Sequence, residues 1–143
     1  RGLTLAIMES CTGGLLSSSI TDIPGSSQYF HGGVVSYLDN VKVSFGVDQS
    51  LIDKFGVVSG QVAESMAQRI REHFHADIGV GITGVAGPEA LSGVEPGNIY
   101  IGIASGQEVR NTHHRLPPNR VLIKRRSVVL SLLEICRLFQ SNF

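Results

Sequence analysis

The amino-acid sequence predicts a three-layer α/β/α sandwich on a mixed, mostly parallel sheet of about five strands, with a hairpin near its C-terminal end. Two apolar runs of strand length, residues 3–8 and 77–83, are separated by segments with helical spacing. Two further runs, residues 97–105 and 108–116, flank a turn at Ser105-Gly106-Gln107 and predict an antiparallel hairpin. Strands that alternate with helices in this way are typical of α/β domains.

The first half of the chain supplies two strands and three helices. Residues 3–8 form a nearly continuous apolar run, as in a strand buried on both faces, and Thr12 can cap the helix that follows. Residues 33–37 predict a second short strand. Apolar spacing around residues 41–45 and 51–55 then predicts two short helices, which places Lys42 about one turn into the first of them.

The second half begins with the clearest helix of the chain. Ser59 is its predicted cap, and apolar residues spaced by four mark one face of it, namely Val62, Met66, Ile70 and Phe74. The glycines of the third strand, residues 77–83, indicate the close approach of a helix or a ligand. After the hairpin, Pro117 and Pro118 end the last strand, and a final helix is predicted from residue 121 to residue 138.

The composition favours one globular domain over residues 1–143. Lys plus Arg and Asp plus Glu both number 12, so no net basic charge points to nucleic acid. No apolar run approaches the roughly 20 residues that span a bilayer, and the two cysteines form no CxxC pair. We therefore expect a cytoplasmic protein without nucleic-acid or membrane partners. Because the first strand follows Arg1 almost at once, we also expect the chain to be a fragment.

The first candidate loop has the sequence Glu-Ser-Cys-Thr-Gly-Gly at residues 9–14. A glycine in a helix costs about 1 kcal/mol relative to alanine, so Gly13 and Gly14 indicate a close approach of the backbone to something else. Amides at this helix N-terminus could hold a phosphate or a developing oxyanion beside Ser10 and Cys11. A glycine-rich turn in which Ser10 is only a cap is an equal alternative.

Other chemistry-bearing residues give weaker signals. The loop at residues 83–88, Thr-Gly-Val-Ala-Gly-Pro, lacks the Gly-Lys-Ser/Thr ending of a P-loop and is a backbone wall or a simple turn. The histidine pairs at 73/75 and 113/114 point apart, which disfavours a metal site. Cys11 could act as a nucleophile, but no histidine is placed to pair with it. Residues 124–126, Lys-Arg-Arg, are typical of a solvated helix face.

Taken together, these segments resemble the C-terminal domain of the competence-damage-inducible proteins, a family that includes the stand-alone nicotinamide mononucleotide deamidases. Residues 9–14 match the ESCTGG signature of that family, and the blocks at 22–27, 32–37, 56–59 and 83–88 follow in the family's order. The resemblance implies an amidohydrolase that removes ammonia from the carboxamide of nicotinamide mononucleotide in pyridine-nucleotide salvage. It implies no metal and no cofactor, and the partner is a small-molecule nucleotide substrate.

The resemblance also implies a Ser/Lys dyad. Ser10 would be the nucleophile and Lys42 its base, while Tyr37, which opens the family's Tyr-x-x-x-x-Lys stretch, would orient Lys42 or relay the proton. Lys42 must then be largely neutral, so burial or a nearby cation has to lower its pKa from about 10.4 toward 7 or 8. The residues implied to border the substrate are Glu9, Cys11, Thr12, Gly13, Gly14, Thr83, Gly84, Ala86, Gly87 and Arg120, the last as a phosphate contact.

The sequence departs from the family at three places. Residues 38–41 read Leu-Asp-Asn-Val where the family has Ser-Asn-Glu-Ala, and residues 89–91 read Glu-Ala-Leu where it has glycine. The family's helix before the first strand is absent, which would leave a sheet face for a homo-oligomer to cover. Two alternatives to an enzyme remain: a nucleotide-binding regulatory module in which Lys42 stays charged, and an assembly domain whose loops only turn the chain.

Overall fold

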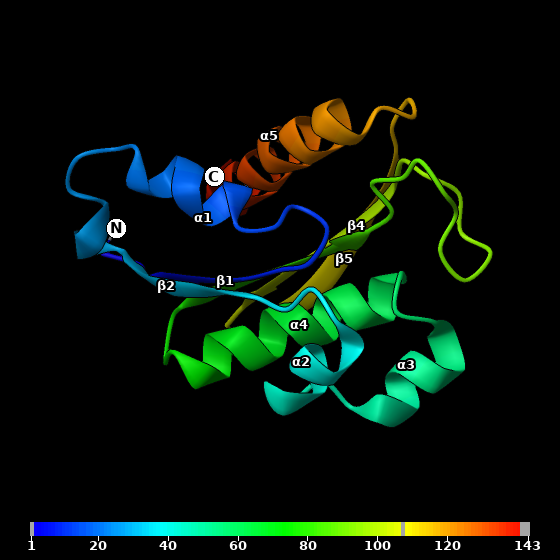
Figure 1. The fold of residues 1–143 in the computed structure, drawn as a ribbon. Helices are drawn as coiled ribbons and strands as arrows, with labels where there is room; N and C mark the ends of the chain where they lie inside the picture. The colour runs from blue at the N-terminus through cyan, green and yellow to red at the C-terminus, as the bar shows by residue number, and fades with distance from the viewer. Residues whose placement is uncertain (1, 107, 141–143) are drawn as a thin grey trace.

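The fold is built on a mixed sheet with helices on both of its faces (Figure 1). The computed structural model describes residues 2–106 and 108–140. The strands are β1 (Leu5–Glu9), β2 (Phe30–Val35), β3 (Ile78–Gly84), β4 (Asn98–Ser105) and β5 (Glu108–Arg115), in the spatial order β2-β1-β3-β4-β5. β1 pairs in parallel with β2 and β3, whereas β4 is antiparallel to both of its neighbours. The predicted fold class is confirmed.

Two helical layers enclose two apolar cores. Figure 1 shows α1 (Leu15–Thr21) and α5 (Arg120–Gln140) on one face of the sheet, with α4 (Gly60–His73), α2 (Asp39–Ser44) and α3 (Gln49–Phe55) on the other. The 3-10 helix η1 (Ser26–Gln28) links α1 to β2. Because side chains alternate along β1, Ile7 packs in the core under α1 and α5, whereas Met8 packs in the core under α4.

The glycines of β3 let α4 lie directly on the sheet. A Cβ added at Gly79 would stand 2.0 Å from the carbonyl oxygen of Ala67, and one at Gly81 would stand 2.4 Å from that of Ala63. Either atom would overlap the helix backbone. The close approach that the sequence predicted at this strand is therefore the approach of a helix.

Most elements lie within a few residues of their predicted positions, but one cap differs. Ser59 caps α4 as predicted, since its Oγ accepts from the Val62 amide over 3.3 Å. The predicted cap of α1 is wrong: the N-cap is Gly14, with φ 97°, while the Thr12 hydroxyl donates to Glu9. The predicted hairpin forms between β4 and β5, and Gln107 of its turn lies outside the described residues.

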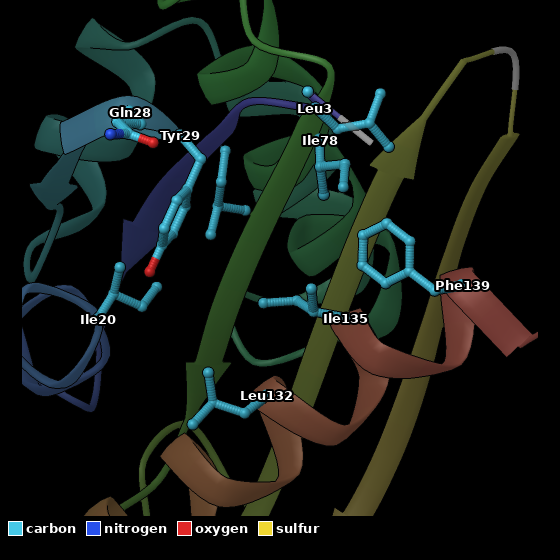
Figure 2. A pocket seen from close by; sticks show the side chains of 10 residues that line it. Leu3, Ile20, Gln28, Tyr29, Ile78, Leu132, Ile135 and Phe139 are labelled. Atoms are coloured by element: carbon cyan, nitrogen blue, oxygen red, sulfur yellow. The ribbon is translucent and has the colours of Figure 1, made fainter. Parts of the chain in front are cut away.

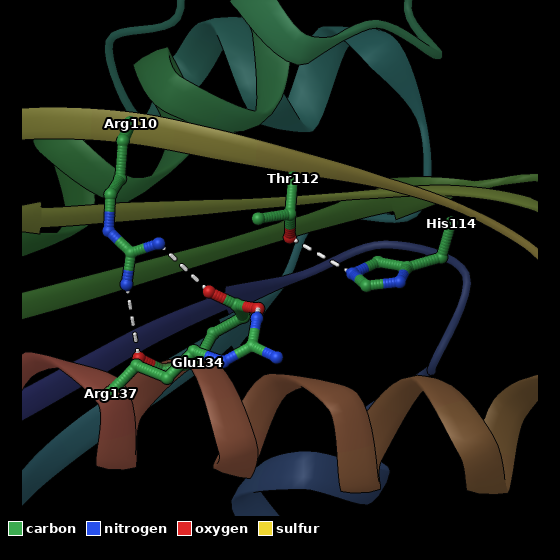
Figure 3. Close-up of polar contacts among 5 residues, drawn as sticks. All are labelled: Arg110, Thr112, His114, Glu134 and Arg137. Atoms are coloured by element: carbon green, nitrogen blue, oxygen red, sulfur yellow. Dashed lines mark hydrogen bonds and ion pairs between the residues drawn. The ribbon is translucent and has the colours of Figure 1, made fainter.

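An ion-pair cluster fastens α5 to the edge strand β5 (Figure 3). The carboxylate of Glu134, only 1% exposed, accepts from Nη1 of Arg110 over 2.9 Å and also from Arg137. Arg110 donates in addition to the backbone carbonyl of Glu134. Beside this cluster, His114 makes a 3.0 Å hydrogen bond with Thr112, and burial lowers the pKa of His114. The cluster holds the helix whose first turn reaches the candidate site.

An apolar groove of about 580 Å³ opens at the amino ends of β1 and β3 (Figure 2). Leu5 and Ile78 line it from the sheet, Ile20 lines it from α1, and Leu132 and Ile135 line it from α5. Its polar side chains are Gln28 and Tyr29. The groove lies at the end of the strands opposite to the candidate site described below. Within the described part of the chain, none of the helices combines the length and hydrophobicity that a membrane span requires.

Candidate active site

The carboxyl ends of three parallel strands bring the candidate residues together. The Ser10 amide, just after β1, donates to the carbonyl of Ile82 in β3 over 3.0 Å. On the other side, the Ser36 amide, just after β2, donates to the carbonyl of Glu9 over 2.7 Å. The loops that follow β1, β2 and β3 therefore start side by side, at the carboxyl ends of the strands, where α/β proteins bind ligands.

Lys42 contacts Ser10 directly. Its Nζ lies 3.0 Å from Ser10 Oγ, 2.6 Å from the carbonyl oxygen of Ser36 and 3.4 Å from the carbonyl oxygen of Tyr37. The Lys42 side chain is 1% exposed, and Ser10 is 8% exposed. Among the described residues, none of these contacts is a carboxylate, so the amine is held by neutral acceptors.

Burial tunes the basicity of two groups at this site. It lowers the pKa of Lys42 from its ordinary value of 10.5, and the negative charge of Asp39 opposes this change in part. Burial also raises the pKa of the Cys11 thiol to about 12. The amine thus approaches the neutral form that a general base needs, whereas the neighbouring thiol is kept from forming a thiolate.

The turn from Glu9 to Gly14 holds Ser10 through a set of internal hydrogen bonds. Gly13 and Gly14 have φ values of 61° and 97°, in the left-handed region that favours glycine. The Gly13 amide donates to the carbonyl of Ser10 over 3.1 Å. This bond occupies the Gly13 amide, so of the amides at residues 12–14 those of Thr12 and Gly14 are the candidates for binding an oxyanion.

A cleft of about 480 Å³ opens in front of Ser10. Its walls are the start of the turn and the loop after β3, together with two side chains from further along the chain. The lining residues are Ser10, Cys11, Tyr37, Gly84, Val85, Ala86, Gly87, Pro88, Glu89, Ala90, Leu91 and Arg120. Arg120 donates to the Tyr37 hydroxyl over 2.9 Å and also to the carbonyl of Gly87. Arg120 thereby connects the loop after β3 to Tyr37, which lies in the segment after β2.

Several residues assigned to the substrate from sequence have their polar groups turned inward. The Glu9 carboxylate and the Thr12 hydroxyl bond to each other over 2.7 Å, and both residues are completely buried. The Thr83 hydroxyl donates to the carbonyl of Val57 over 2.9 Å. The Tyr37 hydroxyl bonds to Arg120, and only its backbone carbonyl contacts Lys42. These side chains support the walls of the cleft rather than line it, with Tyr37 as the exception.

The structure also adds residues that the sequence analysis did not select. Ser36 supplies the shortest contact to Lys42 through its carbonyl, and Glu89 adds a carboxylate to the cleft wall. Lys124 was interpreted as part of a solvated helix face, yet its Nζ lies 3.9 Å from where a Cβ on Gly13 would stand. One turn of α5 separates Lys124 from Arg120, and this i, i+4 spacing was the available signal.

The fold and the site define a three-layer α/β domain with a buried serine and lysine pair at the edge of a cleft. A family model described as the CinA C-terminal domain matches residues 1–139. The chain therefore belongs to the CinA C-terminal domain family, as its sequence blocks indicated.

Curated relatives and solved structures agree with this assignment. The chain is 42% identical over 141 residues to a CinA-like protein of Gemmatimonas aurantiaca, covering 97% of this chain and 33% of that protein. It is 51% identical over 106 residues to a CinA-like protein of Chlorobium limicola, covering 73% and 25%. The chain thus spans a quarter to a third of the length of these relatives.

Two crystal structures share the fold closely. A competence-damaged protein (CinA) superfamily protein of Escherichia coli superimposes with a TM-score of 0.93 at 26% identity, over 96% of this chain and 81% of that one. A competence/damage inducible protein of Agrobacterium tumefaciens gives a TM-score of 0.91 at 30% identity, over 96% and 86%.

Proposed function

We propose that this domain is a serine amidohydrolase that converts the carboxamide of nicotinamide mononucleotide into the carboxylate and ammonia. The observation that carries the proposal is the 3.0 Å contact between Ser10 Oγ and the buried Nζ of Lys42. A buried lysine held by neutral oxygen acceptors beside a serine at a cleft is an arrangement suited to activating a nucleophile. The nucleotide substrate follows from the resemblance to the nicotinamide mononucleotide deamidases, and the cleft volume lies in the range of small-molecule sites.

The acceptors around Lys42 support its role as a base. A neutral amine has two hydrogens and one lone pair. If the hydrogens go to the carbonyls of Ser36 and Tyr37, at 2.6 and 3.4 Å, the lone pair is directed at Ser10 Oγ. The amine then accepts the hydroxyl proton as Ser10 attacks.

In the first half of the reaction, Ser10 Oγ adds to the carboxamide carbon and its proton passes to Lys42. The negative charge that develops on the carbonyl oxygen would be met by the amides of Thr12 and Gly14. The carbon-nitrogen bond then breaks, Lys42 returns the proton to the departing ammonia, and an ester of Ser10 remains. In the second half, Lys42 takes a proton from water, the water oxygen attacks the ester, and Ser10 leaves with that proton.

Arg120 is the proposed partner of the substrate phosphate. It lines the cleft, and both of its hydrogen-bond acceptors, the Gly87 carbonyl and the Tyr37 hydroxyl, are neutral groups. Its positive charge therefore remains available to an anion. Glu89 on the same wall carries the opposite charge, which suits the cationic pyridinium ring of the proposed substrate.

The test is ammonia release from nicotinamide mononucleotide by the chain and by its Ser10→Ala and Lys42→Ala variants, with chelator present throughout. We expect steady release by the parent and a loss of at least about 100-fold in each variant. Binding of the nucleotide is measured in parallel by calorimetry. A folded parent chain that binds the nucleotide without releasing ammonia would instead support the regulatory module, and one that does neither would support the assembly domain.

A further inference from the structure

Glu9 is a completely buried carboxylate that makes four hydrogen bonds at the start of α1. Its Oε1 accepts from the Thr12 hydroxyl over 2.7 Å and from the Leu16 amide over 2.8 Å. Its Oε2 accepts from the Ser17 amide over 2.9 Å and from the Ser17 hydroxyl over 2.7 Å. No side chain caps α1 at its N-cap residue, Gly14. The carboxylate of the preceding strand therefore takes the place of a cap.

This arrangement decides which backbone amides remain for a ligand. The first-turn amides of α1, those of Leu16 and Ser17, are occupied by an internal carboxylate. A substrate anion cannot use them as the helix N-terminus would otherwise allow. What the carboxylate does instead is join the end of β1 to the start of α1, so that the turn between them, with Ser10 in it, is held at both ends.

We propose that Glu9 is a positioning residue, whose buried carboxylate fixes the turn at residues 10–14 so that Ser10 Oγ stays in line with Lys42 and with the amides of Thr12 and Gly14. The proposal rests on the proposed function, because it assumes that Ser10 is the nucleophile. Displacements of about 1 Å in a catalytic group can cost on the order of 100-fold in rate, so a loosened turn should be visible in kcat.

The substitution Glu9→Gln tests this without changing the size of the side chain. Wherever the amide nitrogen of glutamine lies, it faces a backbone N–H, either that of Leu16 or that of Ser17, and two donors then meet. One helix amide loses its acceptor, and the turn must shift to relieve it. The milder variant Thr12→Val removes one donor from the turn and leaves the helix amides bonded.

Glu134→Gln is the matched control. Glu134 is also a buried, hydrogen-bonded glutamate, but it lies on α5, binds Arg110 of β5 and does not line the cleft. We expect both Gln variants to lose stability in urea unfolding. At a temperature where both are folded, kcat should fall by about 10- to 100-fold in Glu9→Gln, with KM nearly unchanged, and should stay within twofold of the parent in Glu134→Gln. The kcat of Thr12→Val should lie between the values of the two Gln variants.

Two further readouts separate a positioning role from a general loss of stability and from a change in the basicity of Lys42. The pH midpoint of kcat/KM should stay close to that of the parent in Glu9→Gln, because the four hydrogen bonds of the Glu9 carboxylate go to Thr12, Leu16 and Ser17 and none of them goes to Lys42. The rate at which a fluorophosphonate phosphonylates Ser10, with fluoride as the leaving group, should fall in parallel with kcat, and this reaction does not require the nucleotide substrate.

The outcomes are distinct. If Ser10 of the parent chain is phosphonylated but no nucleotide is hydrolysed, the proposed substrate is wrong, and the phosphonylation rates of the Glu9 and Glu134 variants still test the role of Glu9. If Glu9→Gln keeps the parental phosphonylation rate, or loses no more of it than Glu134→Gln, Glu9 only stabilises the fold. If Ser10 of the parent chain is never phosphonylated and the chain releases no ammonia from the nucleotide, Ser10 is no nucleophile and both proposals fall.

Discussion

The guanidinium of Arg120 donates to the hydroxyl of Tyr37 over 2.9 Å, although the two residues are 83 positions apart in the chain. The same guanidinium donates to the carbonyl of Gly87. One side chain from the first turn of α5 thus connects the loops that follow β2 and β3. All three of these residues line the cleft in front of Ser10.

Replacing Arg120 should weaken binding of a phosphate-bearing substrate more than it slows chemistry. A hydrogen bond to a charged group contributes about 1.5 to 3 kcal/mol, so Arg120→Met should raise KM for nicotinamide mononucleotide by about tenfold or more. Steady-state kinetics with nicotinamide riboside, which lacks the phosphate, provide the comparison. Tyr37→Phe keeps the cation and serves as the control, with a smaller expected effect. An equal loss of affinity for both substrates would argue against a phosphate contact.

Removing the buried amine should abolish activity without weakening the fold. Lys42 lies in a site that disfavours its charge, so Lys42→Met should be at least as stable as the parent chain in urea at pH 7. Loss of a general base should lower ammonia release by about 100- to 10,000-fold. Lys42→Arg should lose activity as well, because a guanidinium cannot give up its proton. A Lys42→Met protein that is inactive because it is unfolded would contradict this account.

Activity should rise with pH as Lys42 loses its proton, and removing the charge of Asp39 should shift the midpoint of this rise. Since the charge of Asp39 raises the pKa of Lys42, Asp39→Asn should move the rise in kcat/KM to lower pH. Asp53→Asn, an exposed substitution on α3, is the control and should leave the midpoint in place. A midpoint that is identical in all three proteins would show that the titrating group is not Lys42.

The same pKa difference predicts a pH dependence of stability. Between the lowered pKa of Lys42 in the folded chain and its ordinary value of 10.5, the unfolded chain binds more protons. The contribution of Lys42 to the free energy of unfolding therefore rises with pH in this window and is lost as the pH falls through the folded pKa. Urea unfolding of the parent and of Lys42→Met at several pH values isolates this contribution.

The two cysteines should differ in reactivity. Burial raises the pKa of Cys11 to about 12, whereas Cys136 is exposed on α5. Iodoacetamide at pH 8 should therefore label Cys136 and leave Cys11 unmodified in the folded chain, as read by peptide mass spectrometry. Both should react in urea, which controls for the chemistry of the reagent. Equal labelling in the folded state would restore Cys11 as a candidate nucleophile.

The sequence was sufficient to predict the elements and the fold class, because apolar periodicity can be read along the chain without knowing which elements lie next to one another. It could not by itself place Lys42 against Ser10. That contact needs β2 next to β1, and periodicity carries no information on strand order. The residues that hold the amine are also backbone carbonyls, at Ser36 and Tyr37, to which no side-chain pattern points.

Glu9 shows what strand alternation could have revealed. Ile7 faces the core under α1 and α5, and a residue two positions later in a strand faces the same side. Strand alternation therefore already indicates that the Glu9 carboxylate faces α1 rather than the cleft. The prediction that Thr12 caps α1 was wrong for a related reason. Glu9 already accepts from the helix amides that a capping side chain would otherwise bind.

The central place of β1 also bears on when this chemistry can begin during synthesis of the chain. β1 pairs with β3, which lies far along the chain, and Thr4 and Asp77, 73 positions apart, bond across this junction over 2.8 Å. A nascent chain that stops short of β3 already contains Ser10 and Lys42, but it lacks the Ile82 carbonyl that accepts from the Ser10 amide. A lysine in water keeps its proton at neutral pH and cannot act as a base. Under the proposed mechanism, we therefore expect Ser10 to gain its base only once the sheet that positions it beside Lys42 is complete.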